Sequence, residues 1–389
     1  MLRRNLTAFA RMGIVAVVVW LSLSACAGAQ EAPEAEPFDF EAASKDVPKP
    51  REIWPLVREH TAPLEFEIRS DEIVRSDTDP AKKLRKVTAH FYSQELAGKK
   101  WGHPCVIFLP EDADRNLTPE RKGKVVIIGS PPRDYFPIHV DKYGEPIATR
   151  TGYPTMVLSN PGRYPDGSDI ERDIRILNTL RQQTGKNYYN MNCQLAVVYI
   201  QAMDAFEQFL GLDDLKAVVG GHSKRGRSAT VAAAIDPRVA SVIVMGNEGI
   251  YATDRLQFMD FMMWVAHVFD GRPLSRISEV SHQRQQGRTV FQAKVESEAK
   301  IQMVRTWYTY SDDPAWRDLM WYHLLMRKVG DHYEAALHGK IPDAFMIEVG
   351  DVAMGFSGYV SSTPQKLTDA PLVERRSRGS LPRLWEPGD

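Results

Sequence analysis

The chain has 389 residues, of which 43% are hydrophobic, with 49 Lys and Arg against 50 Asp and Glu. This apolar content can form a large core, which excludes an intrinsically disordered chain, and the near-neutral charge lacks the basic excess of nucleic-acid binders. The sequence carries no Walker A motif, no HExxH and no paired CxxC. We therefore expect no metal, no cofactor and no nucleic-acid partner.

The N-terminus has the layout of a secretory signal. Three arginines among the first eleven residues precede an uncharged, apolar run over residues 12–25. The run ends in Leu23-Ser24-Ala25-Cys26, which resembles the bacterial lipobox and implies a lipid anchor on Cys26. An ordinary cleaved signal and an uncleaved anchor are the alternatives, but the run is short for a membrane span. Ala27, rather than the Asp of an inner-membrane retention signal, favours the outer membrane of the cell envelope.

Composition divides the rest of the chain. Residues 27–50 are acidic and rich in Ala and Pro, which predicts a solvated tether after the 1–26 signal. The folded domain is expected over 51–356, followed by a polar tail of unassigned role over 357–389. Cys105 and Cys193 either form a disulfide in an oxidising envelope or remain as two buried thiols.

Strand patterns come first in the folded part, and strands then alternate with helices. Alternating or wholly apolar runs predict strands at Leu64–Arg69, Lys86–Tyr92, Cys105–Leu109, Lys124–Ile128, Pro154–Leu158, Leu215–Val219 and Val239–Met245. Helical spacing predicts helices at Asp169–Gln182, Asn192–Leu210 and Lys224–Ile235. This order favours an α/β fold with a mostly parallel sheet and helices on both faces. Residues 251–340, rich in Trp and Met, are expected to form a helical cap or side region, and Ala344–Val349 one further strand.

The chemical motif is Gly221-His222-Ser223-Lys224-Arg225-Gly226, between an apolar strand and a helix of small residues. This arrangement predicts a nucleophile elbow, in which Ser223 sits on a sharp strand-to-helix turn beside a small Gly221. The helix N-terminus would direct the N–H of Lys224 at an oxyanion. Arg225 stands where GxSxG places its second glycine. The alternative is a serine that only caps the helix.

The stretch Gly221–Val239 (GHSKRGRSATVAAAIDPRV) resembles the PhoPQ-activated pathogenicity-related family, whose elbow reads G-x-S-K-R-G. Tyr92-Ser93-Gln94 and Trp101-Gly102-His103 resemble an upstream segment of the same family. The resemblance covers roughly residues 60–250 and implies an exported α/β-hydrolase of undefined substrate. The elbow is also distantly similar to that of glucuronoyl esterases.

A serine nucleophile needs a histidine base and an acid that orients it. Glu248 follows an apolar strand where the resembled family carries an Asp, and Asp351 is the other candidate acid. No histidine follows Asp351, so the favoured set is Ser223, Glu248 and His338, with His332 as the alternative base. The triad is expected to be incomplete if none of these pairs forms.

Two further features bear on the substrate. The second oxyanion donor is expected from the loop Ser130-Pro131-Pro132-Arg133, where the prolines have no N–H and Arg133 or Asp134 must donate. Lys224 and Arg225 could attract the carboxylate of a sugar acid or a peptide, or could simply be solvated.

The sequence therefore predicts a serine hydrolase of ester or amide bonds that acts on a small-molecule, sugar-acid or peptide acyl substrate. Weak activity is expected from this chain because its base is uncertain. The alternative is a non-catalytic envelope lipoprotein that keeps the fold as a binding surface.

Overall fold

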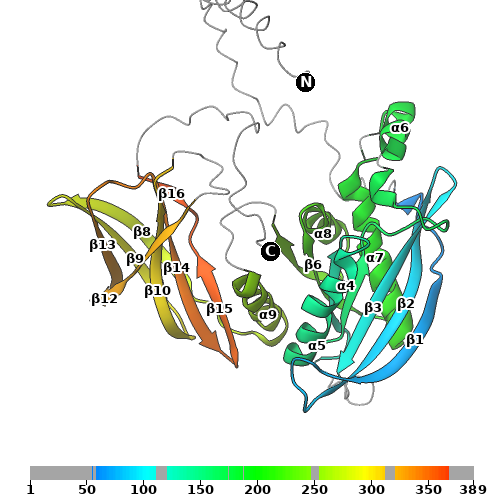
Figure 1. Cartoon of the computed structure of the whole chain (residues 1–389), viewed down its shortest axis with the longest axis horizontal. Coiled ribbons are helices and arrows are strands. Elements are labelled where there is room, and N and C mark those ends of the chain that lie inside the picture. The colour runs from blue at the N-terminus through cyan, green and yellow to red at the C-terminus, as the bar shows by residue number, and fades with distance from the viewer. Residues whose placement is uncertain are drawn as a thin grey trace, which may run out of the picture. The chain divides into compact units, whose positions relative to one another are not determined.

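The computed structural model describes residues 55, 58–110, 121–173, 175–186, 188–246, 254–311 and 320–367 (Figure 1). The expected signal and lipobox at 1–26 and the tether at 27–50 lie outside these residues. Among the described residues, no helix is long and apolar enough to cross a membrane.

The largest element is a seven-stranded sheet with the order β1-β2-β3-β5-β4-β6-β7. Its strands are β1 (Phe66–Arg75), β2 (Lys83–Leu96), β3 (Lys99–Pro110), β4 (Lys124–Ser130), β5 (Thr155–Ser159), β6 (Lys216–His222) and β7 (Val239–Met245). The pairs from β1 to β5 are antiparallel, whereas β5, β4, β6 and β7 run parallel to one another. The expected α/β class, with antiparallel strands first, is confirmed.

Both faces of this sheet are covered, and its inner parallel strands are apolar over most of their length. In β4, Val125 and Ile127 pack into one cluster with α7 (Met191–Leu210) and α8 (Lys224–Ile235). Val126 and Ile128 point the other way, toward a second cluster. Side chains alternate across a strand, so a run such as KVVII serves two cores at once.

The second cluster contains residues of three short or medium helical segments, η1 (Val140–Gly144), α5 (Glu145–Thr151) and α9 (Asp254–Asp270), with α4 (Tyr135–His139) ahead of them. The helix expected at Asp169–Gln182 is instead divided into η2 (Ile170–Arg172) and α6 (Arg175–Thr184). Helix α7 is capped at its N-terminus by Asn190, whose side chain accepts from the Cys193 N–H, and at its C-terminus by Gly211, which has a φ of 63°. These are the expected cap residues for such ends.

Among the described residues of 251–340, the expectation of a helical region is correct only for α9. Strands follow it: β8 (Arg276–Gln285), β9 (Arg288–Glu296), β10 (Lys300–Thr309), β11 (Tyr322–Leu325), β12 (Arg327–Val329) and β13 (His332–His338). Two tight turns explain the error. Gln286-Gly287 joins β8 to β9 with positive φ at both residues, and Gly330-Asp331 joins β12 to β13. Such two-residue loops are hairpin signals, and Trp and Met are equally suited to sheet packing.

The strand expected at Ala344–Val349 exists but does not extend the seven-stranded sheet. It is β14 (Ala344–Ala353), which pairs antiparallel with β10, β15 (Phe356–Ser361) and β16 (Gln365–Lys366) in a five-stranded sheet. The first part of the expected polar tail is therefore strand. This sheet and the four-stranded sheet β12-β13-β9-β8 share one hydrophobic cluster, which includes Phe291 of β9 and Phe345 of β14.

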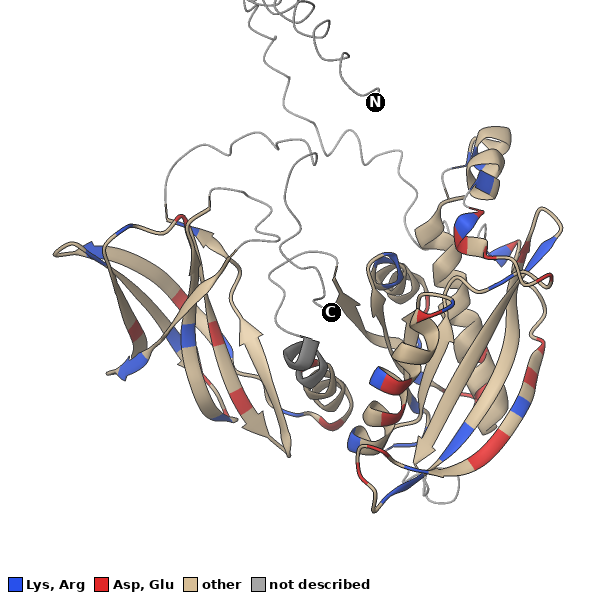
Figure 2. Ribbon diagram, in the orientation of Figure 1, with Lys and Arg blue, Asp and Glu red and all other residues tan. Residues whose placement is uncertain are grey.

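The two outer strands of the seven-stranded sheet differ in charge. Half of the β1 sequence FEIRSDEIVR is charged, and Figure 2 shows acidic and basic residues along this strand. Strand β7, VASVIVM, has no charged residue, and Met245 is its one buried residue. By contrast, every residue of β5 is buried. An outer strand without charges is uncommon, because charge is one of the usual means of protecting a sheet edge.

Cys105 lies on β3 and Cys193 on α7, and both are buried, free thiols. Burial raises the pKa of Cys105 to about 12. Of the two alternatives for this pair, the structure therefore supports two core thiols rather than a disulfide.

Candidate active site

Ser223 lies between β6 and α8 with a φ of 57° and a ψ of −124°. A residue with a side chain rarely adopts this conformation, and such strain gathers at functional sites. The side chain makes no capping hydrogen bond to α8, which removes the alternative of a plain capping serine. The backbone is held in place instead, because the Ser223 N–H donates to the Met245 oxygen at 2.8 Å.

The space beside the serine is closed by backbone and by Tyr199. A Cβ at Gly221 would lie 2.6 Å from the Cβ of Arg225 and 2.7 Å from the Tyr199 hydroxyl, so only glycine fits there. The same hydroxyl donates to the carbonyls of Gly220 at 3.0 Å and Arg225 at 3.2 Å. Tyr199 therefore joins the last residues of β6 to the first turn of α8, which keeps the elbow tight.

Lys224 and Arg225 both bind Glu171, which lies in η2. The Arg225 Nη2 donates to Glu171 Oε2 at 2.6 Å, and Lys224 pairs with the other carboxylate oxygen. Burial alone would raise the pKa of Glu171, but the two cations outweigh it and lower the pKa. Since Glu171 already neutralises both side chains, the structure favours the reading of Lys224 and Arg225 as structural cations over that of a docking point for an anionic substrate.

Arg225 also holds the loop that follows β5. Arg225 is 4% exposed, and its Nε donates to the Asn160 carbonyl at 2.5 Å. On the other side of this loop, the Ser159 carbonyl accepts from His103 Nδ1 at 2.9 Å. The elbow is thus tied through Asn160 and Ser159 to β3.

His103 belongs to the upstream segment that resembles the PhoPQ-activated family. Because its Nδ1 faces a carbonyl, its Nε2 accepts from the Ser93 hydroxyl at 2.8 Å. Complete burial lowers the pKa of His103 to about 3, so it stays neutral. Ser93 and Trp101 are fully buried as well. This segment therefore positions the sheet and contributes no base to Ser223.

The loop after β4 runs beside the elbow, since Gly129 of β4 is in register with Gly221 of β6. Arg133 has a φ of 62°, and its Nε forms an ion pair with the Asp169 Oδ2 at 3.1 Å. The backbone N–H groups of Arg133 and Asp134 make no hydrogen bond to the described residues. Both remain candidates for the second oxyanion donor.

Two histidines lie close to the elbow. His222 directly precedes Ser223, and its ring packs against Gly246 at the end of β7. His139, at the end of α4, has a buried Nδ1 without a hydrogen-bond partner among the described residues. Burial, followed by the charges of Lys142, His222 and Arg225, lowers the pKa of His139 to about 4. A neutral imidazole held in this way is a hydrogen-bonding group but a weak proton acceptor.

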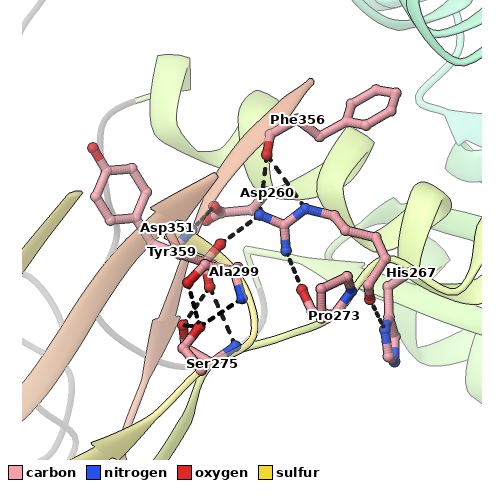
Figure 3. Close-up of polar contacts among 10 residues, drawn as sticks. Asp260, His267, Pro273, Ser275, Ala299, Asp351, Phe356 and Tyr359 are labelled. Carbon is pink, nitrogen blue, oxygen red and sulfur yellow. Dashed lines mark hydrogen bonds and ion pairs between the residues drawn. The ribbon is translucent and has the colours of Figure 1, made fainter. Parts of the chain in front are cut away.

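The expected acids have different outcomes. Glu248 lies outside the described residues, so its role stays a prediction. Asp351 lies within β14 and is fully buried, where it pairs with Arg272 and accepts from the Ser275 N–H at 3.2 Å (Figure 3). Arg272, two residues after the end of α9, is also fully buried. With its oxygens committed to these groups, Asp351 stabilises the fold and is not free to orient a base.

His332 and His338 occupy the two ends of β13. The His332 Nδ1 lies 3.4 Å from the Asp331 Oδ1, and its Nε2 lies 3.4 Å from the Gln292 Nε2. Gln292 belongs to β9 of the four-stranded sheet, and Asp331 lies in the turn before β13. Within the part of the chain that the structure describes, the Ser223 hydroxyl makes no hydrogen bond to any histidine. The pairing of Glu248 with His332 or His338 therefore stays a prediction.

Figure 3 also shows Asp260, a carboxylate on α9 that the sequence did not single out. Its Oδ1 accepts from the Tyr359 N–H at 2.8 Å. Burial, followed by the negative charges of Glu348 and Asp351, raises the pKa of Asp260 to about 7. No group of three or more His, Cys, Asp or Glu that could hold a metal occurs among the described residues.

The sheet, its helices and the strained serine elbow define an α/β-hydrolase fold. The family model of the PhoPQ-activated pathogenicity-related proteins matches residues 74–257, which confirms the resemblance over that segment. No curated protein matches the chain.

Several solved esterases are similar over part of the chain. A glucuronoyl esterase from Solibacter usitatus is 17% identical, with a TM-score of 0.36, over 55% of this chain and 62% of its own. An acetyl xylan esterase from Paenibacillus sp. R4 is 16% identical, with a TM-score of 0.32, over 49% and 55%. A cold-adapted esterase from an Arctic intertidal metagenomic library is 16% identical, with a TM-score of 0.29, over 46% and 63%. The chain thus spans less than two thirds of each of these proteins.

Proposed function

We propose that the protein is a serine hydrolase of ester bonds, with Ser223 as nucleophile. The observation that carries the proposal is the backbone of Ser223, which is held at positive φ between β6 and the N-terminus of α8. A serine that makes no capping hydrogen bond has no structural use for this strain. The strain is accounted for if it presents the hydroxyl to a substrate.

The chemistry follows from the elbow. The Ser223 Oγ attacks the acyl carbon, its proton leaves to a base, and the carbonyl oxygen becomes an oxyanion beside the N–H of Lys224. The carbon–oxygen bond to the leaving group then breaks, and the leaving oxygen takes up a proton. Water hydrolyses the acyl-enzyme to the free acid and restores the Ser223 hydroxyl.

The proton acceptor is the weak part of this site. In the described residues the Ser223 hydroxyl has no histidine partner, and His139 is a poor acceptor. Without a positioned base, only the oxyanion hole and binding contribute, which in serine enzymes amounts to roughly a thousandfold to ten-thousandfold over water. We therefore expect slow hydrolysis of activated esters.

The test uses p-nitrophenyl acetate and a fluorophosphonate probe on the full chain. We expect slow release of nitrophenol and slow labelling, both absent in Ser223→Ala. Equal rates for the wild type and Ser223→Ala would overturn the proposal: another residue would do the chemistry if both hydrolyse the ester, and a non-catalytic binding protein would remain if neither does. The variants His332→Ala and His338→Ala decide whether either residue is the base, since a true base would lower turnover at least a hundredfold when removed.

We also propose that the enzyme is anchored in the bacterial envelope through a lipid on Cys26. The lipobox-like ending Leu23-Ser24-Ala25-Cys26 supports this location. The substrate would then be an ester that reaches the cell envelope. The pairing of Lys224 and Arg225 with Glu171 makes a neutral acyl group the simpler choice.

A further inference from the structure

The outer edge of β7 has no strand hydrogen-bonded to it in the described part of the chain. Among the described residues β7 pairs only with β6, and the regular part of that pairing covers Ser241–Met245. The Val244 side chain is 43% exposed, although the neighbouring parallel strands β4 and β6 are buried over nearly their whole length. The backbone N–H and C=O groups on the outer side of such a strand can accept another strand.

The opposite edge of the same sheet is protected. Strand β1 carries both acidic and basic residues, and its register with β2 shifts between Ile68 and Ser70. Asp71 forms an ion pair with Arg85 of β2 at 2.7 Å. Charges and a bulge on an edge strand are the devices that prevent a further strand from pairing. Strand β7 has no charge and no proline, and its pairing with β6 shifts register only at its start, between Val239 and Ser241.

We propose that β7 pairs antiparallel with β7 of a second copy of this chain, so that the two seven-stranded sheets become continuous. A second copy fits because VASVIVM carries no charge that would repel an identical strand, and antiparallel pairing of identical strands obeys a two-fold axis. Pairing of two different edges would form an open fibre. Of the two edges of the seven-stranded sheet, β1 is protected, so β7 against β7 is the remaining pairing of this sheet with itself, and it closes at two copies.

The dimensions are adequate for a reversible dimer. Seven residues of strand extend about 23 Å at roughly 3.3 Å per residue. Helix α8 contacts β7 on one face, and the Trp264 Nε1 of α9 donates to Ser241 at 2.9 Å on the other. Each copy would therefore contribute a strand with helices on both faces.

Sedimentation equilibrium of the full chain in mild detergent, at concentrations from about 5 to 200 µM, tests the proposal. We expect a protein mass that rises toward twice the monomer mass for the wild type and remains at the monomer mass for Val244→Lys. The monomer mass is 44.0 kDa for the uncleaved chain. Ile73→Lys is the matched control, because Ile73 is 61% exposed on the protected strand β1. This variant should dimerise as the wild type does. Circular dichroism and the thermal midpoint show whether Val244→Lys is folded.

A second measurement needs no variant. Hydrogen exchange of the wild type should slow at least tenfold at the β7 amides between the lowest and highest concentration, with no change in β1. A monomeric wild type at 200 µM overturns the proposal. A dimer that a folded Val244→Lys leaves intact, or assembly beyond two copies, also overturns it.

Discussion

Arg225 and Glu171 form an ion pair across the elbow, with the guanidinium almost fully buried and the carboxylate partly exposed. Removal of one partner leaves a buried charge without compensation, which costs about 3–5 kcal/mol. We expect Glu171→Ala to lower the free energy of unfolding by about 3 kcal/mol, toward the lower end because Glu171 is partly exposed. Urea unfolding measures this. Asp71→Ala, which removes the exposed pair with Arg85, is the control and should cost less than about 1 kcal/mol. Equal losses of unfolding free energy in the two variants would show that burial of Arg225 does not make its ion pair more stabilising than an exposed one.

Ser223 stores strain that a glycine would release. We expect Ser223→Gly to be more stable than Ser223→Ala by about 1 kcal/mol, because only glycine adopts a φ of 57° without steric cost. Both variants should lose fluorophosphonate labelling. The difference in their stability therefore reports backbone strain, and the loss of labelling reports the chemistry of the hydroxyl. Thermal unfolding of the three proteins provides the comparison. Identical midpoints for Ser223→Gly and Ser223→Ala would mean that the backbone relaxes in solution.

Asp260 should make stability depend on pH. Its pKa is about 7 in the folded protein and near 4 in the unfolded chain, so between these values the folded state holds a proton that the unfolded state has released. Stability from this group is therefore complete below pH 4 and falls as pH rises to 7. Each pKa unit corresponds to about 1.4 kcal/mol, so the loss is about 2–4 kcal/mol.

The variant Asp260→Asn isolates this effect, since its amide oxygen can still accept from the Tyr359 N–H. We expect it to be more stable than the wild type at pH 8 and similar at pH 4. Urea unfolding at both values gives the difference. A stability gain that is the same at pH 4 and pH 8 would assign the effect to something other than titration of Asp260.

Lipidation of Cys26 predicts that Cys26→Ser remains uncleaved or becomes soluble, while the wild type fractionates with membranes. Mass spectrometry of the N-terminal peptide and fractionation of cells measure the change. Unchanged mass and unchanged partition in the variant would reject the lipobox. This outcome is independent of Ser223, whose variants should partition as the wild type does.

The sequence predicts the first half of the fold well because two strong periodicities alternate there. Uninterrupted apolar runs such as Lys124–Ile128 indicated buried strands, and the small residues after Ser223 indicated the elbow. The elbow's supports were harder to predict. Glu171 lies 54 residues before Arg225, and only the folded chain shows that they pair. No local pattern distinguishes that carboxylate from a solvated one.

The prediction of helices in the second half of the chain was wrong for a different reason. Residues 276–338 have mixed spacing, and a count of Trp and Met does not separate helix from sheet. The turn at Gln286-Gly287 was the available signal for a hairpin. Asp351 is a candidate triad acid by sequence because its Gly-Asp pair follows an apolar run. In the structure its carboxylate pairs with Arg272, which lies 79 residues earlier in the chain. Long-range pairing of this kind depends on tertiary structure.

The position of α9 has a consequence for how this chain can be divided for expression. The family match ends at residue 257, within α9, whereas Phe261, Val265 and Phe269 complete the hydrophobic cluster on one face of the sheet. A fragment cut at residue 257 would lack these side chains and should aggregate. A fragment cut after Asp270 would keep them but would uncover Met263, which packs on Gly358 of β15. A fragment that keeps Met263 covered therefore has to extend through β15.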